Sequence, residues 1–180
     1  MEISEELEKI MDLAVDEAMR TGNFSVQPEH LLLAILRHGA NDAAKAMISC
    51  GADTAGLKQA LDGTMFRAET IPYGKRDEIV FCEKTGELLG GAVREGIKAG
   101  AERTGAIHLL LAMMRAEGGK CRSALTEAGV SCKGIAAFME AEGIQVSASC
   151  ATTLQDDIVK ALTEQLESRH FQPGTRGVFS

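Results

Sequence analysis

The stretch PEHLLLAILRH, Pro28–His38, returns in altered form as AIHLLLAMMRA, Ala106–Ala116. Both contain His-Leu-Leu-Leu-Ala, with an arginine three residues after the alanine. His108 follows His30 by 78 positions, and the same shift aligns the flanking residues without a gap. The chain therefore contains an internal repeat, and its fold must be predicted from the repeated unit. Identical pairs at this spacing include Ala14/Ala92, Glu17/Glu95, Gly22/Gly100, Arg37/Arg115 and Gly51/Gly129.

Each repeat predicts four helices. Ser4 can cap the first one, and Gly22 is placed to end it. Pro28 suits the first turn of the second helix, where its missing N–H costs nothing. Thr104 and Ser131 are plausible N-caps in the second repeat. The helices are expected at about 4–21, 28–38, 42–50 and 53–61 in the first repeat and 82–99, 106–116, 120–128 and 131–142 in the second.

The predicted fold class is all-α, with two pseudo-symmetric four-helix repeats and a C-terminal helix. Helix-forming residues dominate, and alternating β-branched runs are nearly absent. Apolar residues from Leu154 to Leu166 predict the last helix, which either packs back on the domain or docks on a partner. The expected domain limits are 1–143 for the double repeat (repeat one 3–62, linker 63–78, repeat two 79–143) and 144–180 for a linker, this helix and a flexible tail.

Charge and composition exclude several classes of function. The 180 residues carry a net charge of −7, which argues against nucleic-acid binding and against anionic membrane surfaces. No apolar run approaches the roughly 20 residues that span a bilayer, and the acidic start does not resemble a secretory signal. The five cysteines are scattered, which is typical of reduced thiols in a cytoplasmic protein.

No group of residues predicts catalysis, a metal or a cofactor. His30 and His108 occupy equivalent positions, so a local structural role explains both copies at once, and a shared metal or acid–base pair is disfavoured. The cysteines lie in no Cys–His arrangement that would activate a thiol or bind zinc. The leucine-rich runs 31–36 and 109–114 are expected to be core.

At this point the residues resemble the Clp N-terminal repeat, the double four-helix module of AAA+ unfoldases, and are most similar to the N-domains of ClpA and ClpC. The resemblance rests on VQPEHLLLAIL (Val26–Leu36), on its echo and on the preceding helix ELEKIMDLAVDEAM. It covers about residues 3–142. The chain lacks the G-x-x-x-x-G-K-[ST] phosphate loop of an ATPase module, so no enzyme activity is expected.

The resemblance implies a non-enzymatic protein-binding module of the Clp chaperone/protease system. Its partners would be a ClpS-like adaptor, substrate proteins, or Clp ATPase or protease subunits. The alternative is an accessory structural subunit that docks on a Clp protease ring. Recovery of an adaptor or of tagged clients would support the first hypothesis, and recovery of ring subunits alone would support the second.

The same resemblance indicates a contact region at Ser4, Pro28 and Glu29, which we expect to be exposed first-turn residues. In ClpC-type domains a glutamate before the histidine of each repeat helps to bind phosphoarginine, whereas here Ile107 replaces the second one. The first repeat should therefore lead in binding. Two interpretations of Glu29 stay open: an acid that complements the helix dipole, or a residue that contacts the partner.

Overall fold

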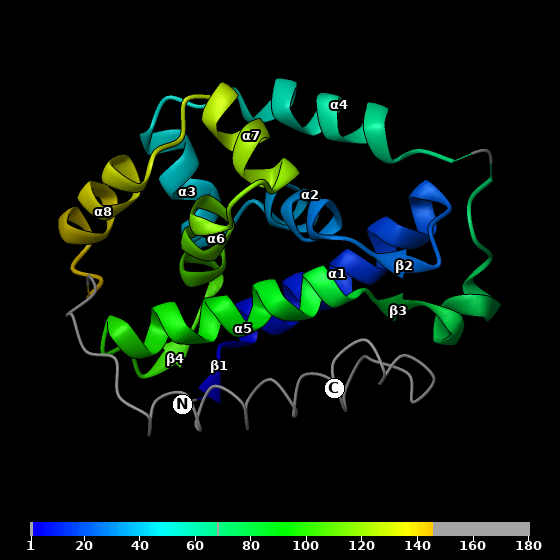
Figure 1. Ribbon diagram of the computed structural model, residues 1–180, viewed down its shortest axis with the longest axis horizontal. Coiled ribbons are helices and arrows are strands. Elements are labelled where there is room, and N and C mark those ends of the chain that lie inside the picture. Colours follow the sequence, from blue (N-terminus) through cyan, green and yellow to red (C-terminus); the bar gives the residue numbers. More distant parts are fainter. Residues whose placement is uncertain (1, 68, 146–180) are drawn as a thin grey trace.

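The computed structural model describes residues 2–67 and 69–145. Within these ranges the chain folds into eight α-helices, one 3-10 helix and four two-residue strands (Figure 1). The all-α prediction is confirmed for this part, while the predicted helix after residue 150 lies outside the described residues. The elements are β1 Glu2–Ile3, α1 Glu5–Thr21, β2 Ser25–Val26, α2 Pro28–His38, α3 Asp42–Ser49, α4 Thr54–Met65, η1 Tyr73–Glu78, β3 Val80–Phe81, α5 Glu83–Lys98, β4 Arg103–Thr104, α6 Ala106–Arg115, α7 Lys120–Glu127 and α8 Cys132–Ala141.

Local signals set the helix ends of the first repeat. The Ser4 hydroxyl accepts a hydrogen bond from the backbone N–H of Leu7 at 3.1 Å, which caps α1 as predicted. Gly22 ends α1 in the left-handed conformation with a φ of 78°. Asp53 caps α4 through the N–H of Gly56 at 3.0 Å. The helix α4 ends at Met65, four residues later than predicted, and it continues through Gly63, a residue type that often ends helices.

One predicted cap in the second repeat is wrong. Ser131 caps α8, but Thr104 lies in β4 with its side chain fully buried, and Gly105 is the N-cap residue of α6. Here the side chain that closes the helix start is His108, whose Nδ1 accepts a hydrogen bond from the backbone N–H of Gly105 at 2.9 Å. His30 does the same for α2 with the N–H of Gln27, so a hydroxyl cap is needed in neither copy.

Two short parallel strand pairs join the repeats. Strand β1 pairs with β4, and β2 pairs with β3, so each strand of one repeat pairs with a strand of the other. Figure 1 shows these pairs at two separate places, with β1 and β4 together below and β2 and β3 together at the right. As a result, the start of α1 lies beside the start of α6, and the start of α5 lies beside the start of α2. The prediction did not contain these strands.

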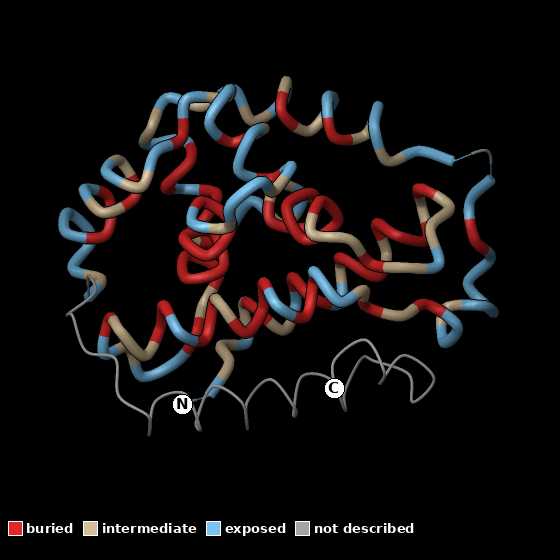
Figure 2. The backbone as a smooth tube through the Cα atoms, in the orientation of Figure 1, coloured by how far each residue is buried: buried red, intermediate tan, exposed pale blue. Residues whose placement is uncertain are grey.

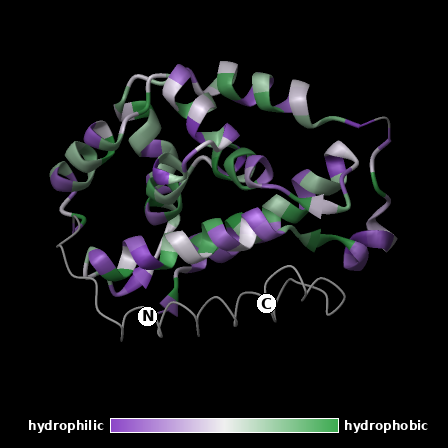
Figure 3. Ribbon diagram, in the orientation of Figure 1, coloured by the Kyte–Doolittle hydropathy of each residue, from purple (hydrophilic) through white to green (hydrophobic). Residues whose placement is uncertain are grey.

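The helices α2 and α6 form the buried centre of the molecule. Figure 2 shows both as mostly buried, and Figure 3 shows polar residues along the outer sides of the surrounding helices. All five residues of Leu31–Ile35 have zero exposure, and Leu109 and Leu110 match them in the second repeat. The two leucine runs are therefore core, as predicted, because an apolar helix is stable only when surrounded by other elements.

The linker between the repeats is bound to the end of α1. The backbone N–H of Arg67 donates to the carbonyl of Thr21 at 2.8 Å, and that of Ile71 donates to Met19 at 2.9 Å. Farther along, Arg76 pairs with Asp16. The predicted linker 63–78 also includes the end of α4 and all of η1, so it is more regular than its sequence indicates.

Candidate protein-binding cleft

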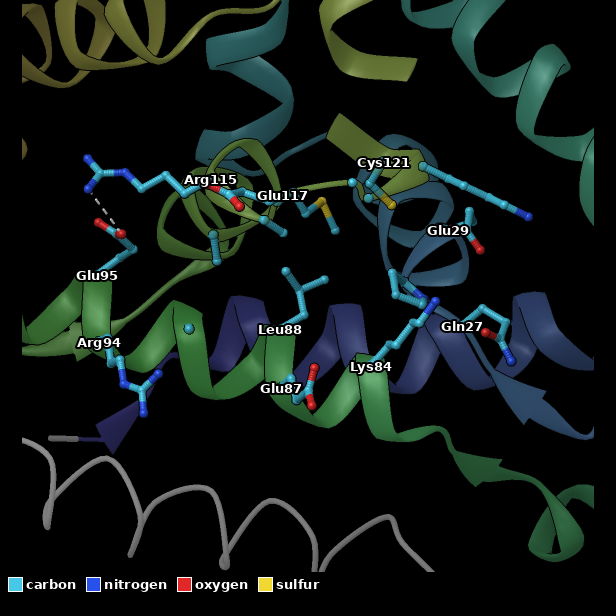
Figure 4. A pocket seen from close by; sticks show the side chains of 18 of the residues that line it. Gln27, Glu29, Lys84, Glu87, Leu88, Arg94, Glu95, Arg115, Glu117 and Cys121 are labelled. Carbon is cyan, nitrogen blue, oxygen red and sulfur yellow. Dashed lines mark ion pairs between the residues drawn. The ribbon is translucent and has the colours of Figure 1, made fainter. Parts of the chain in front are cut away.

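A cleft of about 510 Å³ lies between α5 and the ends of three other helices. One face of α5 forms its floor, and the last turn of α6, the loop to α7 and the starts of α7 and α2 form its walls (Figure 4). It belongs mainly to the second repeat, with the start of α2 contributed by the first. The charged residues that line it are Glu29, Lys84, Glu87, Arg94, Glu95, Lys98, Arg115, Glu117 and Lys120.

Pro28 and Glu29 lie together at the rim of this cleft. Pro28 is the first residue of α2 and Glu29 the second, so the carboxylate complements the helix dipole from the first turn. The expectation that the three contact residues are exposed is wrong, because only 8% of Glu29 is accessible to solvent and Ser4 and Pro28 are partly buried. Within the described ranges Glu29 takes part in no hydrogen bond or ion pair through its side chain, and its carboxylate oxygens are not among the buried atoms without a partner, so they reach the solvent of the cleft.

The Cys121 thiol lies close enough to Glu29 for the charge of the carboxylate to affect the pKa of the thiol. Burial raises the pKa of this thiol well above its ordinary value, and the negative charge of Glu29 raises it further. Cys121 therefore stays protonated at neutral pH and is a poor nucleophile. Its contribution to the cleft wall is apolar surface.

Ser4 lies at a different place from Pro28 and Glu29. Its backbone N–H donates to the carbonyl of Thr104 at 2.9 Å, so Ser4 sits at the β1–β4 pair, beside the start of α6. The place where the starts of α1 and α6 meet is the pseudo-symmetric counterpart of the place where the starts of α5 and α2 meet. The structure thus separates the three predicted contact residues into one pair and one distant serine.

At the equivalent place beside α6, an internal side chain bridges the two helix starts. Glu6 reaches across to α6, where its Oε1 accepts a hydrogen bond from the backbone N–H of Ala106 at 3.3 Å. Burial and the nearby charge of Asp42 raise the pKa of Glu6. In the second repeat both partners change, because Lys84 replaces Glu6 and Pro28, which has no N–H, replaces Ala106. Because Pro28 has no N–H to donate, the exchange of Glu6 for Lys84 leaves no backbone donor without an acceptor. No bond equivalent to the one from Ala106 to Glu6 closes the cleft.

Most cations of the cleft have no internal partner. Arg115 forms an ion pair with Glu95, with 3.3 Å between Arg115 Nη1 and Glu95 Oε1. No other residue of the described ranges lies within ion-pair distance of Lys84, Lys98 or Lys120. The sequence-based prediction missed all of these residues. Comparing charges between equivalent positions would have indicated Lys84, which replaces Glu6, and Lys120, which replaces Asp42, but not Lys98, which replaces an arginine.

The two histidines have the local structural role that repeat symmetry predicts. Since His30 Nδ1 accepts from Gln27, its Nε2 must carry the hydrogen that it shares with the Thr21 hydroxyl at 2.9 Å. Ala99 replaces this threonine in the second repeat, and His108 Nε2 is buried without a partner in the described part of the chain. Burial lowers the pKa of both histidines to about 4, so both are neutral at pH 7.

Chemistry at metals or activated thiols finds no support among the described residues. In residues 2–67 and 69–145 no three His, Cys, Asp or Glu side chains gather as a metal site would require. The four cysteines of these ranges, Cys50, Cys82, Cys121 and Cys132, are free thiols. None of the helices described is long and apolar enough to cross a bilayer. The arrangement is suited to recognition by surface complementarity.

Comparison with known proteins agrees with this architecture. The chain is 30% identical over 132 residues to the negative regulator of genetic competence ClpC/MecB of Bacillus subtilis, and 28% identical over 130 residues to the chaperone protein ClpB of Oceanobacillus iheyensis. Each match covers 71% of this chain and 15% of the relative, so the chain spans about 15% of the length of these proteins.

The fold is also found in a solved structure. The Hsp104 N-terminal domain from Candida albicans matches with a TM-score of 0.64 and 18% identity, over 81% of this chain and 95% of that one. The family model of the Clp repeat (R) N-terminal domain matches residues 2–128. The chain therefore belongs to the Clp repeat N-terminal domain family.

Proposed function

We propose that this domain is a non-enzymatic, cytoplasmic module that binds an adaptor or substrate protein of a Clp chaperone system through the cleft at Pro28 and Glu29. The observation that supports the proposal is the Glu29 side chain, which lines an open cleft and forms no hydrogen bond or ion pair with a described residue. Its carboxylate is therefore free to accept hydrogen bonds from donors of a bound protein.

The asymmetry of the two repeats supports a single main contact. Ile107, the residue equivalent to Glu29, is 3% exposed and apolar, and Glu6, the residue equivalent to Lys84, accepts a hydrogen bond from the backbone of Ala106. A partner therefore finds unpaired charged groups in the cleft, whereas at the other strand pair Glu6 is already hydrogen-bonded to the backbone of Ala106. Ser4, which lies at that second place, stays a predicted contact only for a partner large enough to reach both.

Binding of the purified chain, residues 1–180, to two probes tests the proposal. One probe is a ClpS-type adaptor from the same organism, and the other is casein, a protein without a stable fold. Glu29→Ala removes the carboxylate, and Glu127→Ala removes an exposed acid outside the cleft as a matched control. For at least one probe, Glu29→Ala should weaken binding by about tenfold or more, since truncating one partner of a buried charge pair costs about 2–5 kcal/mol.

Two results would contradict the proposal. The first is that neither probe binds to the unmodified chain at probe concentrations up to about 100 μM, well above the dissociation constant of an interaction of micromolar affinity. The second is that Glu29→Ala and Glu127→Ala bind each probe equally well. Binding to Clp protease-ring subunits alone, unaffected by Glu29→Ala, would instead support an accessory docking subunit.

A further inference from the structure

The cleft carries a positive surplus on a chain whose net charge is −7. Five basic and four acidic side chains line it. One pair is internal, since Arg115 Nη1 lies 3.3 Å from Glu95 Oε1, drawn as a dashed line in Figure 4. The other basic residues form no ion pair with a residue of the described ranges, and they are Lys84, Arg94, Lys98 and Lys120. Their counter-charges must therefore come from salt ions or from a partner.

This surplus distinguishes the second repeat from the first. Three acidic residues of the first repeat have basic equivalents that line the cleft, and one basic residue has an acidic equivalent there. The surplus is thus not a property of the scaffold that both copies share. The exchanges are Glu6 to Lys84, Asp16 to Arg94, Asp42 to Lys120 and, with the opposite sign, Lys9 to Glu87.

The start of α7, which lines the cleft, has also lost its cap. In the first repeat Asn41 caps α3, because its Oδ1 accepts from the backbone N–H of Ala44 at 2.8 Å. Gly119 is the equivalent of Asn41, and no side chain caps α7. Lys120 takes the place of the acidic Asp42 in the first turn. The N–H groups and the dipole of α7 therefore favour an acceptor that comes from outside the helix.

Glu29 lies at the same end of the cleft and requires donors. It is 8% exposed, lines the cleft and has no partner among the described residues. Figure 4 shows Lys84 extending from α5 toward the start of α2, which carries Glu29. A small inorganic anion would supply acceptors alone. A polypeptide segment supplies both kinds of group, since its carboxylates accept from lysines while its backbone N–H groups donate to Glu29.

We propose that the cleft binds an acidic segment of the partner protein, whose aspartate or glutamate side chains contact Lys84, Lys98 and Lys120. This inference rests on the proposed function, because both place the partner in the same cleft. Since the chain as a whole is acidic, such a segment is repelled from most of its surface and directed to the cleft. The contacts would add specificity and speed of association, and added salt would weaken them.

The length of the cleft sets the spacing of the acidic residues. Lys84 and Lys98 are fourteen positions apart on α5, which is about 21 Å at a rise of 1.5 Å per residue. An extended segment covers that distance with about six residues. The segment should therefore carry acidic residues about six positions apart, one near Lys84 and Lys120 and another near Lys98.

Titrations of the ¹⁵N-labelled full chain with three peptides test the inference. Each is an eleven-residue Gly/Ser peptide with blocked ends, and its positions 2, 3 and 9 carry glutamate, glutamine or lysine. We expect the glutamate peptide to give saturable amide shifts at Gly91 and Gly119, which line the cleft. The glutamine peptide should bind at least tenfold more weakly, and the lysine peptide should not shift these residues. Raising the salt from about 0.05 to about 0.5 M should weaken the glutamate peptide about tenfold.

Three variants separate a binding site from lysines that are merely solvated. Lys84→Glu restores the acid of the first repeat and should weaken the glutamate peptide by tenfold or more. Lys98→Gln removes the charge at the other end and should weaken it several-fold. Lys133→Glu reverses a charge at an exposed position of α8 outside the cleft and should leave the affinity unchanged.

Equal affinity for the glutamate and glutamine peptides would overturn the inference. So would equal binding of the glutamate peptide by Lys84→Glu and Lys133→Glu, or saturation of the same residues by inorganic phosphate but not by the glutamate peptide. Each of these results leaves the proposed function standing if an adaptor or casein still binds in a manner that depends on Glu29. Absence of all protein binding, with the glutamate peptide still bound, would refute the proposed function instead.

Discussion

Replacing Gly22 with alanine should destabilise the fold through two separate costs. The first is conformational, since Gly22 ends α1 with a φ of +78°, a region that alanine adopts with difficulty. For residues other than glycine this left-handed conformation costs about 1–2 kcal/mol. This cost depends on the backbone of the turn alone.

The second cost comes from the linker that crosses the end of α1. A methyl group on Gly22 would lie far inside van der Waals contact with the carbonyl oxygen of Glu69, and 3.1 Å from Arg67 Cβ. The linker can move away only by breaking the backbone hydrogen bonds that Arg67 and Ile71 make to α1. Each such bond contributes about 1 kcal/mol, so the total loss for Gly22→Ala should be about 2–4 kcal/mol.

Gly51→Ala is the matched control for the conformational cost. Gly51 has a φ of +80°, but nothing lies within 4 Å of a Cβ built on it. Urea denaturation followed by far-ultraviolet circular dichroism measures the free energy of unfolding of each variant. Gly22→Ala should lose about 1–2 kcal/mol more than Gly51→Ala, or about 2–8 °C more in melting temperature for a chain of this size. Equal losses would refute the argument that the linker is held firmly against α1.

Two further predictions concern the buried histidines. Thr21→Val should cost about 1–3 kcal/mol of unfolding free energy because it leaves His30 Nε2 without a partner, whereas Ala99→Thr should stabilise the chain by up to about 1 kcal/mol by supplying one to His108; opposite signs are expected in the same denaturation assay. The free energy of unfolding should also fall by a few kcal/mol as the pH drops from about 6.5 to 4, because the folded chain, with both histidine pKa values near 4, binds fewer protons than the unfolded chain in this window. A flat pH profile after replacing His30 and His108 with glutamine would confirm their role, and an unchanged slope would contradict it.

The helix limits could be predicted from the sequence because their determinants are local. Ser4 and Ser131 cap their helices through residues three positions ahead, and Gly22 ends α1 through its own backbone conformation. The error at Thr104 has a physical reason. The imidazole of His108 already accepts a hydrogen bond from the backbone N–H of Gly105 at the start of α6. The sequence alone does not show that this side chain turns back toward Gly105.

The strand pairs could not be predicted in the same way. Two residues carry no alternation pattern, and the partners of β1 and β2 lie in the other repeat, far along the chain. Yet these pairs decide which helix starts lie side by side. They therefore decide that Glu29 shares its cleft with α5 and that Ser4 does not. Because the strand pairs were not predicted, the prediction grouped Ser4, Pro28 and Glu29 as one contact region.

The sequence did contain the information that identifies the cleft, in the differences between the repeats. Lys84 replaces Glu6, and Lys98 replaces Arg20. The two lysines are fourteen positions apart on α5, which is close to four full turns, so they lie on the same face of the helix. Both line the cleft. Lys84 replaces Glu6, which accepts from the backbone of Ala106, and Lys98 replaces Arg20, which donates to Glu17. Because Glu6 and Arg20 form hydrogen bonds within the domain whereas Lys84 and Lys98 form no ion pair with a described residue, these two exchanges distinguish the cleft from the equivalent place beside α6.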